Sequence, residues 1–447
     1  MRFRISIIIL LTVIISTETQ EQIKTSLNPG YEQRIKDYID TLKIFDTHEH
    51  MFNPEMLKST NFLDFSLLLQ QNSYDGLISA GMPDSTLRQL FFEPLTPKEK
   101  WKIIEPYWNN SFNTTPDRIL LLAIKNLYGI DDLNESTVET LSLKIKKAYE
   151  GDWFNHVLKD LCRIDYIIED GDNMGDKYDF IRYAKRFNSW LTLRTKYRID
   201  SLAVMEVEPI YTLEDYVRSL RTAFENALKQ GMVAIKINVS YKRTLSFDNV
   251  TTEAARKVFH SLVNGNEDFT LSLQEAKPLQ DYMLHQLLNL AEKYKIPVAF
   301  HTGLQAGGGN IIDNSDPRLL VNLFFQYPDI NFVLFHGSYP FGGELTTLAR
   351  NFKNVYLDMN WTYAISPAYA DRYLGEWLEA VPASKIMAFG GDQRCVENTY
   401  GNLIIAKQII SDVLTDKVRN GYLSESEAKT IARMILHDNG VKFYNLK

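Results

Sequence analysis

The side chains best suited to chemistry in this chain are histidines and an aspartate that end short apolar runs. His48 and His50 follow one such run, and His301, His336 and Asp392 each close another. Imidazole and carboxylate groups at the C-terminal ends of separate parallel strands are typical of a divalent metal in the mouth of a β-barrel. The pattern therefore favours a metal-dependent hydrolytic enzyme or a close mechanistic relative.

The paired histidines lie in the segment 45–50, which reads FDTHEH. Because side chains of an extended segment alternate with period two, His48 and His50 face the same side. The pair alone is a weak signal, and the three further ligand types at strand ends give it weight. Asp46, which ends the strand, is a candidate partner for a ligand histidine. The remaining histidines fall in helical or insertion segments, where we expect surface or structural roles: His156, His260, His285 and His437.

The composition is that of an ordinary globular protein, with 447 residues, 45% hydrophobic and 23% charged, and a net charge of −7. No basic block stands out, which argues against nucleic acid as a partner, because phosphate neutralisation needs clustered Lys and Arg. We expect a small-molecule substrate and leave a homo-oligomer open. Cys162 and Cys395 are expected to be free or buried thiols, since nothing resembles a cysteine-based zinc site.

The N-terminus has the pattern of a secretory signal peptide over residues 1–19. Arg2 and Arg4 precede an apolar run at 5–15, and small polar residues follow at 16–19. The alternative is a membrane anchor, but the run is shorter than the ~20 residues that span a bilayer. We therefore expect an exported protein, periplasmic or secreted, with no stable membrane insertion after cleavage.

The rest of the chain alternates strand and helix patterns, which predicts one barrel domain over residues 20–447. The expected strands lie at 44–46, 164–168, 201–207, 232–237, 296–300, 331–335, 355–357 and 386–389. Eight strands with helices between them are typical of an α/β fold of the (β/α)₈ TIM-type barrel class.

Two insertions are expected in this barrel. Residues 51–152 have helical periodicity and predict a large helical cap after strand 1, and residues 241–281 form a second, irregular insertion. Helices are also expected at 213–230, with Thr212 and Asp215 as a capping box and Gly231 as the stop, and after the capping box at 424–427.

Several motifs together resemble the amidohydrolase superfamily, in its amidohydrolase-related (type 2) branch. They are DTHEH at 46–50, HTG at 301–303, HGSYPF at 336–341 and GD at 391–392. The C-terminal half also resembles the amidohydrolase-like half of fungal and plant proteins fused to a glutamine-synthetase-like domain. The stretches concerned are 355–358, 397–400 and 439–446.

The resemblance implies roles for the site residues. His48, His50, His301 and Asp392 would hold one divalent metal ion, for which we expect zinc, with manganese as the alternative. His336 would polarise the substrate or shuttle a proton. Asp392 would also accept a proton from metal-bound water, whose pKa the ion lowers toward ~7.

Three cations near the predicted mouth are candidate substrate-binding residues. Lys236 lies on the fourth strand, where dinuclear members of the superfamily carry a carbamylated lysine that bridges two metal ions. Such a bridging role remains an alternative to substrate binding. Arg243 and Arg394 could each hold a substrate carboxylate in a bidentate fork or lie in solvent.

We thus expect an exported metal-dependent hydrolase that cleaves an amide or ester bond of a small, carboxylated molecule. One alternative is a decarboxylase or an isomerase on the same site, because uronate isomerases resemble this layout in having a large insertion after strand 1. Another alternative, from a different class, is a non-catalytic binding protein with a decayed site.

Overall fold

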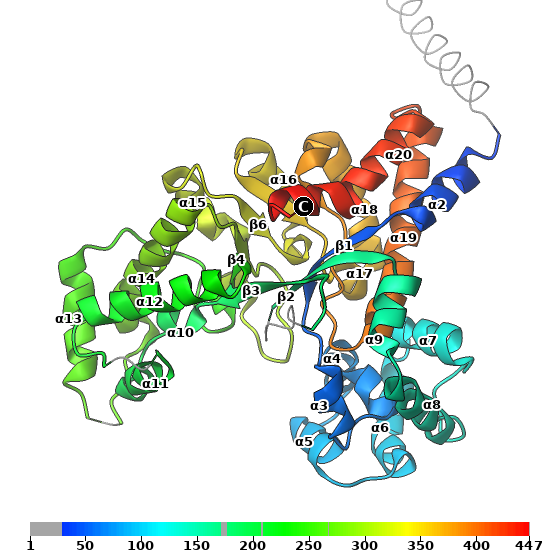
Figure 1. Ribbon diagram of the computed structural model, residues 1–447, viewed down its shortest axis with the longest axis horizontal. Coiled ribbons are helices and arrows are strands. Elements are labelled where there is room, and N and C mark those ends of the chain that lie inside the picture. Colours follow the sequence, from blue (N-terminus) through cyan, green and yellow to red (C-terminus); the bar gives the residue numbers. More distant parts are fainter. Residues whose placement is uncertain (1–28, 171–176, 207–208, 267, 447) are drawn as a thin grey trace, which may run out of the picture.

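The computed structural model describes residues 29–170, 177–206, 209–266 and 268–446, and its centre is an eight-stranded parallel sheet. The strands follow one another in chain order: β1 Ile44–Glu49, β2 Ile164–Glu169, β3 Ile181–Arg186, β4 Met232–Ile237, β5 Val298–Phe300, β6 Phe332–Leu334, β7 Val355–Asp358 and β8 Ile386–Met387. The segment after β8 hydrogen-bonds to β1, as from Asp392 N to His48 O at 2.8 Å, and this closes the barrel. The predicted (β/α)₈ fold is confirmed (Figure 1).

Helices connect the strands and surround the barrel (Figure 1). The longer ones are α2 Tyr31–Thr41, α12 Leu213–Lys229, α14 Leu273–Tyr294, α16 Gly342–Asn351, α18 Pro367–Ala380, α19 Val396–Arg419 and α20 Glu425–Arg433. The shorter ones are α10 Asn188–Leu191, α15 Val321–Gln326, α17 Thr362–Ile365 and α21 Asn439–Phe443. Both capping boxes expected from the sequence are present, one from Thr212 to Asp215 and one from Ser424 to Glu427.

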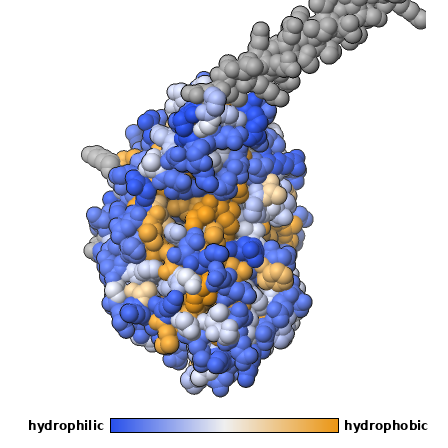
Figure 2. All heavy atoms as spheres, turned by 90° about the vertical axis from the view of Figure 1, so that its right-hand side faces the viewer, coloured by the Kyte–Doolittle hydropathy of each residue, from blue (hydrophilic) through white to orange (hydrophobic). Residues whose placement is uncertain are grey.

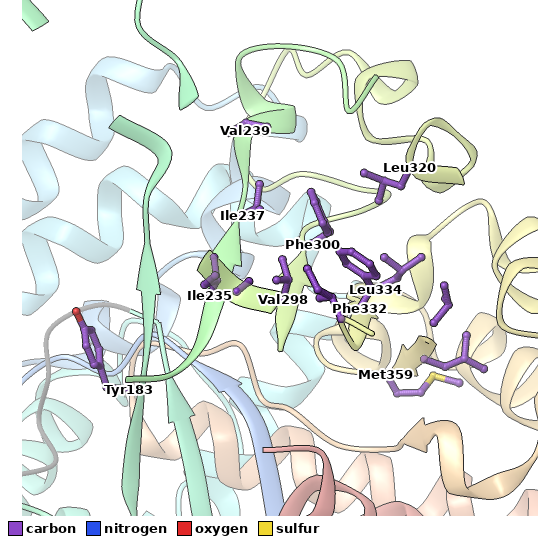
Figure 3. Close-up of a cluster of buried hydrophobic side chains, with 14 of the residues drawn as sticks. Tyr183, Ile235, Ile237, Val239, Val298, Phe300, Leu320, Phe332, Leu334 and Met359 are labelled. Atoms are coloured by element: carbon purple, nitrogen blue, oxygen red, sulfur yellow. The ribbon is translucent and has the colours of Figure 1, made fainter. Parts of the chain in front are cut away.

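Each strand contributes to two apolar layers because its side chains alternate between the faces of the sheet. Ile235 and Ile237 belong to the large cluster between the sheet and its helices, together with residues of β5 and β6 (Figure 3). Ala234, Ala299 and Val333 belong to a smaller cluster on the other face, inside the barrel. Lys236 pairs in register with Ala299 and therefore lies on the interior side.

The connection between β1 and β2 carries the helical segment expected at 51–152. Its helices are α3 Pro54–Lys58, η1 Phe65–Leu69, α4 Asn72–Ser79, α5 Asp84–Phe92, α6 Pro97–Ser111, α7 Thr115–Tyr128, α8 Val138–Glu150, α9 Trp153–Asn155 and η2 His156–Leu161. They enclose a hydrophobic core of their own and lie together beside the barrel (Figure 1). The helix α7 packs against α19, which joins this segment to the barrel wall.

One predicted strand is wrong. Residues 201–206 lie in the helix α11 Lys196–Glu206, and residue 207 lies outside the described part of the chain. The third strand is instead β3, which the sequence analysis did not identify. A short continuous apolar run such as Leu202 to Met205 fits a helix and a strand equally well. Meanwhile β3 was hidden by its three basic residues, since only part of it faces a core.

The second insertion is more regular than predicted. The single turn η3 Val239–Tyr241 leads into it, it contains the helix α13 Thr252–Val263, and α14 already begins at Leu273. Ser272 caps α14 and forms a capping box with Glu275, which explains the early start. The residues 241–281 therefore form a structured wall after β4.

The expected signal peptide at 1–19 lies outside the described residues. Among the residues that the structure describes, no helix is long and apolar enough to cross a membrane. Cys162 and Cys395 are both free and buried, as expected. Figure 2 shows one face of the molecule, on which hydrophilic residues dominate and hydrophobic side chains gather around a central hollow.

Candidate metal centre

Three of the four predicted metal ligands converge at the mouth of the barrel. His48 is the fifth residue of β1, His50 follows that strand, and Asp392 lies in the loop after β8. The Nε2 atoms of His48 and His50 lie 3.6 and 3.3 Å from the same oxygen, Asp392 Oδ1. One donor atom from each residue falls within 4.8 Å of the other two, which is close enough for all three to bind one ion. The expected common orientation of the two histidines is thus confirmed.

The backbone at this mouth adopts conformations that are unfavourable for most residues. Asp392 has a φ of 51° and His336 a φ of 64°, both in the left-handed region. Such strain costs ~1–3 kcal/mol and clusters at functional sites, where the surrounding structure enforces it. Gly391 precedes Asp392 because a Cβ there would collide with the carboxylate of Glu49. The placement of Asp392 is therefore determined by the fold around it.

The protonation state of the His48 and His50 imidazoles suits them to bind a cation. His50 Nδ1 lies 2.9 Å from the carbonyl oxygen of Asp170, so that it carries the proton and leaves the Nε2 lone pair toward Asp392. Burial lowers the pKa of His50, and it holds the pKa of His48 well below the ordinary value, a direction that nearby Lys236 reinforces. Both rings are consequently neutral near pH 7. Two neutral imidazoles and a carboxylate are a donor set that fits a divalent metal ion.

Asp170 and Arg186 support this cluster from the ends of β2 and β3. The guanidinium of Arg186 donates two parallel hydrogen bonds to the Asp170 carboxylate, at 2.6 and 2.7 Å. Burial opposes ionisation of Asp170, but the combined effect of Arg186, His50 and Lys236 outweighs it and holds the pKa below its ordinary value. Asp170 Oδ2 also lies 3.9 Å from His48 Nε2.

His301 and His336 form a pair beside the three donors. His336 Nε2 lies 2.8 Å from His301 Nδ1, and His301 Nε2 lies 2.8 Å from the carbonyl oxygen of Leu304. A carbonyl only accepts, so His301 carries its proton on Nε2 and accepts from His336 at Nδ1. No lone pair of His301 then remains for a metal. The structure therefore does not bring His301 into the donor cluster, and its role as a ligand stays a prediction.

His336 keeps one ring nitrogen turned toward the cluster. Its Nδ1 lies 3.8 Å from Asp392 Oδ2 and 3.4 Å from the carbonyl oxygen of Asn360. Burial holds the pKa of His336 well below its ordinary value, an effect that neighbouring His301 increases. The ring is thus neutral near pH 7, and its Nδ1 faces both the Asn360 carbonyl oxygen and the carboxylate of a candidate ligand.

Two buried carboxyl groups lie beneath the cluster. Asp46 Oδ1 accepts from the backbone N–H of His48 and of Gly391, each at 3.2 Å, so that it holds the two chain segments together rather than an imidazole. Burial raises the pKa of Asp46 to about 7, and burial together with Asp46 raises that of Glu49 well above its usual range. Two carboxyl groups in contact away from water share a proton, because both cannot ionise there.

The predicted substrate-binding cations lie in three different environments. Lys236 is buried, with its Nζ 3.3 Å from His48 Nε2 and 3.8 Å from the ring centre of Phe335, and burial lowers its pKa to about 8. Arg394 is at the mouth, where its Nε donates to Gln71 Oε1 at 3.2 Å. Arg243 is buried in a different place and pairs with Asp281 at 2.7 Å.

Sequence reasoning missed three residues at this site. Asp170 follows β2 directly, and the buried run at 164–169 was a signal that could have identified it. Arg186 was missed together with β3. Gln71, whose Nε2 lies 3.4 Å from Asp392 Oδ1, comes from the helical segment after β1, and no sequence pattern marks it.

Comparison with known proteins shows similarity to one family over the C-terminal part of the chain. The sequence pattern of the Amidohydrolase family matches residues 243–446, which include β5 to β8 and Asp392. Protein fluG of Emericella nidulans, a glutamine synthetase-fusion protein, is 28% identical over 242 residues, or 52% of this chain. The chain spans only 28% of the length of that relative.

Solved structures share the fold over nearly the whole chain. A uronate isomerase from Thermotoga maritima has a TM-score of 0.79 at 16% identity and covers 94% of this chain and 98% of its own. A glucuronate isomerase from Caulobacter crescentus has a TM-score of 0.76 at 18% identity, covering 93% and 94%. A candidate metal-dependent hydrolase from Lactobacillus casei has a TM-score of 0.66 at 16% identity, covering 92% and 97%. The chain thus shares its fold with these structures, and its C-terminal part, residues 243–446, is similar to the Amidohydrolase family.

Proposed function

We propose that the protein is an exported metal-dependent hydrolase that cleaves an amide or ester bond of a small, carboxylated molecule. The observation that carries the proposal is the convergence of His48, His50 and Asp392 within 4.8 Å at the barrel mouth. These residues would hold one divalent ion, for which zinc is the first expectation and manganese the alternative. Such an ion, when bound, polarises a carbonyl group and lowers the pKa of a water molecule toward ~7.

The side chains around the cluster supply the proton transfers that hydrolysis needs. His336 is fixed through Nε2 on His301, and its Nδ1 faces Asp392 Oδ2 beside the Asn360 carbonyl oxygen, so that it can take or deliver a proton at one defined atom. Asp392 offers a second carboxylate oxygen, Oδ2, on the side of His336. We assign His336 as general acid and base and Asp392 as proton acceptor, since hydrolysis requires both transfers.

Arg394 is the first candidate for the substrate carboxylate. Its Nε is used by Gln71, and the structure gives its terminal nitrogens no ion pair with any described residue. Lys236 is the second candidate because its ammonium lies inside the barrel next to His48. The guanidinium of Arg243 is engaged by Asp281, Gln280 and two backbone carbonyls, which favours a structural role there.

A second candidate function is the isomerisation of a hydroxy acid of the uronate type. The observation in its favour is the likeness to two uronate or glucuronate isomerases over more than nine tenths of this chain, which includes most of the helical segment after β1. Moving a proton between neighbouring carbons needs a fixed base beside a polarised carbonyl, and His336 could serve in either reaction.

Metal analysis and product mass test the proposal together. Purified protein should contain one divalent ion per chain, and Asp392→Asn should lose it. A screen of N-acyl amino acids, γ-glutamyl compounds, lactones and uronates should give products heavier by one water. Unchanged mass with a new sugar acid selects the isomerase, and released carbon dioxide selects a decarboxylase. Two ions per chain with a carbamate on Lys236 would disprove the mononuclear site, and an absence of any turnover would favour a binding protein.

The carboxylate is tested by comparing an acidic substrate with its methyl ester. Arg394→Met should lower kcat/KM strongly for the acid and little for the ester, because a guanidinium orients a carboxylate through a bidentate fork. Lys236→Met and Arg243→Met are measured in parallel, with Arg221→Met on α12 as the control. If all the variants keep the wild-type ratio of acid to ester, the substrate carboxylate is not bound by these cations.

A further inference from the structure

A cavity distinct from the candidate metal site lies among the loops of the barrel. Its volume is about 440 Å³, within the range of small-molecule sites. It is formed by the loops that follow β3 and β4 and by the segment around the start of α14. The lining residues are Asn188, Ser189, Thr192, Arg194, Thr195, Arg198, Lys242, Arg243, Thr270, Leu273 and Gln280. None of the three donors of the metal centre is among them.

The lining is strongly cationic. It contains four basic side chains, Arg194, Arg198, Lys242 and Arg243, and no carboxylate. The remaining side chains are hydroxyls and amides, apart from Leu273. The protein as a whole has a net charge of −7, so that this concentration of positive charge is local. Such a cavity attracts anions at a molecule that otherwise repels them.

The walls of this cavity are held in place by hydrogen bonds. Gln280 is buried, donates from Nε2 to the carbonyl oxygen of Leu193 at 3.1 Å and accepts from Arg243 Nη1 at 3.1 Å. Arg194 donates from Nε to the carbonyl oxygen of Leu271 at 2.7 Å, beside a bridge between Thr195 and Thr270. The segments from three separate parts of the chain therefore meet in one defined arrangement.

Most of the positive charge in this cavity is available to a ligand. Arg243 is paired with Asp281, which leaves it largely neutralised. Arg194 uses only its Nε in the hydrogen bonds described above, so that its terminal nitrogens are available. Arg198 and Lys242 form no side-chain hydrogen bond or ion pair with any residue in the described ranges. Three cations thus surround the space without a matching carboxylate.

We propose that this cavity binds a small oxyanion that carries at least two negative charges, such as a phosphate ester or a polycarboxylate. Guanidinium forks, an ammonium and several hydroxyls are the donors that such oxygens prefer. A monovalent acid would leave two of the three cations unmatched. The inference concerns residues outside the metal centre and stands independently of the reaction proposed above.

The test is calorimetric binding to the metal-loaded full-length protein, with inorganic phosphate and citrate as probes and acetate as the monovalent comparison. The double variant Arg198→Ala with Lys242→Ala removes two exposed cations that have no partners to lose. The control, Arg88→Ala with Lys146→Ala, changes the net charge equally on α5 and α8, away from the cavity. We expect one site per chain for phosphate or citrate and at least about tenfold weaker binding in the double variant, since charge-assisted hydrogen bonds are strong. The control should bind as the wild type does.

The two probes also identify the ligand class. Tighter binding of phosphate indicates a phosphate ester, and tighter binding of citrate indicates a polycarboxylate. Equal affinity in the wild type and the double variant would place the anion elsewhere, for instance on the metal, and would overturn the proposal. Absence of binding by both probes, or equally good binding of acetate, would also overturn it.

Discussion

At the scale of single residues, the site is defined by which nitrogen of each histidine carries a proton. The carbonyl of Asp170 fixes the proton of His50 on Nδ1, and the carbonyl of Leu304 fixes that of His301 on Nε2. The first arrangement directs a lone pair toward Asp392, and in the second both ring nitrogens of His301 contact protein groups. Neutral imidazoles are maintained by burial, which lowers the pKa of all four histidines at the mouth.

The first prediction concerns His336. The change His336→Asn should reduce turnover by at least about a hundredfold while the metal stays bound, because general acid–base groups contribute ~10²–10⁴. Asparagine tolerates the left-handed backbone at this position, so that the loop should be retained. Turnover and metal content are measured on the same sample, with His156→Asn, an exposed histidine, as the control. Equal loss of metal and activity would make His336 a ligand instead.

The second prediction concerns the partner of Asp170. Arg186→Met removes two hydrogen bonds from the buried carboxylate of Asp170. The backbone carbonyl of the same residue orients His50. We expect the affinity for the divalent ion to fall by about 10–100-fold, the usual effect of losing a residue that supports a ligand. Competition with a chromophoric chelator measures this affinity. Arg182→Met on the same strand is the control, and equal affinities of the two variants would show that the pair does not support the metal site.

At the scale of elements, one buried carboxylate joins the helical segment to the barrel. Glu397, in the first turn of α19, accepts from Tyr128 at 2.6 Å, from Trp153 Nε1 at 2.9 Å and from Tyr149 at 3.2 Å. The three donors come from α7, α9 and α8, so that a single side chain receives bonds from three helices. Asp392 lies only a few residues before Glu397, and the same contact therefore anchors the loop that carries a candidate ligand.

The third prediction follows from this contact. Glu397→Gln turns an amide N–H₂ toward at least one of the three donors and weakens the remaining hydrogen bonds. We therefore expect the free energy of unfolding, measured in urea, to fall by about 1.5–3 kcal/mol. The matched control is Glu139→Gln, at an exposed position of α8. A stability equal to that of the control would mean that the apolar contacts alone hold the helical segment on the barrel.

At the scale of the whole molecule, a closed barrel brings residues from distant parts of the sequence to one mouth. His48 and Asp392 are far apart along the chain, yet a backbone hydrogen bond of 2.8 Å joins them directly. Parallel strands all end on the same side, so that every ligand-type residue after a strand arrives at one face. The helical segment after β1 and the wall after β4 then surround this face.

The fourth prediction concerns the N-terminus of the whole protein. Expressed in a bacterial host, the mature protein should begin between about Ser16 and Gln22, because Arg2 and Arg4 precede an apolar run too short to span a bilayer. Mass spectrometry of the exported protein determines its first residue. Recovery of intact Met1 in carbonate-washed membranes would show that the segment is a membrane anchor and is not cleaved. Replacing Ile8 and Ile9 by Asp should block export in either case.

The barrel, seven of its strands and three residues of the candidate metal site could be predicted from the sequence. These features depend on local patterns: short apolar runs, capping boxes, and ligand types placed directly after strands. His48, His50 and Asp392 could be predicted because the C-terminal ends of all parallel strands lie at the same face of a barrel. Lys236 was placed correctly near the mouth for the same reason.

Which of these groups can act together depends on contacts that form when the chain folds. The third strand is formed by Ile181–Arg186, whereas the predicted apolar run from Ser201 to Met205 lies in a helix. His301 pairs with His336 and with the carbonyl oxygen of Leu304, and Arg243 pairs with Asp281. These contacts form only when the chain folds. The sequence does not show which group will hydrogen-bond to a ring nitrogen or a guanidinium, because these partners come together only when the chain folds.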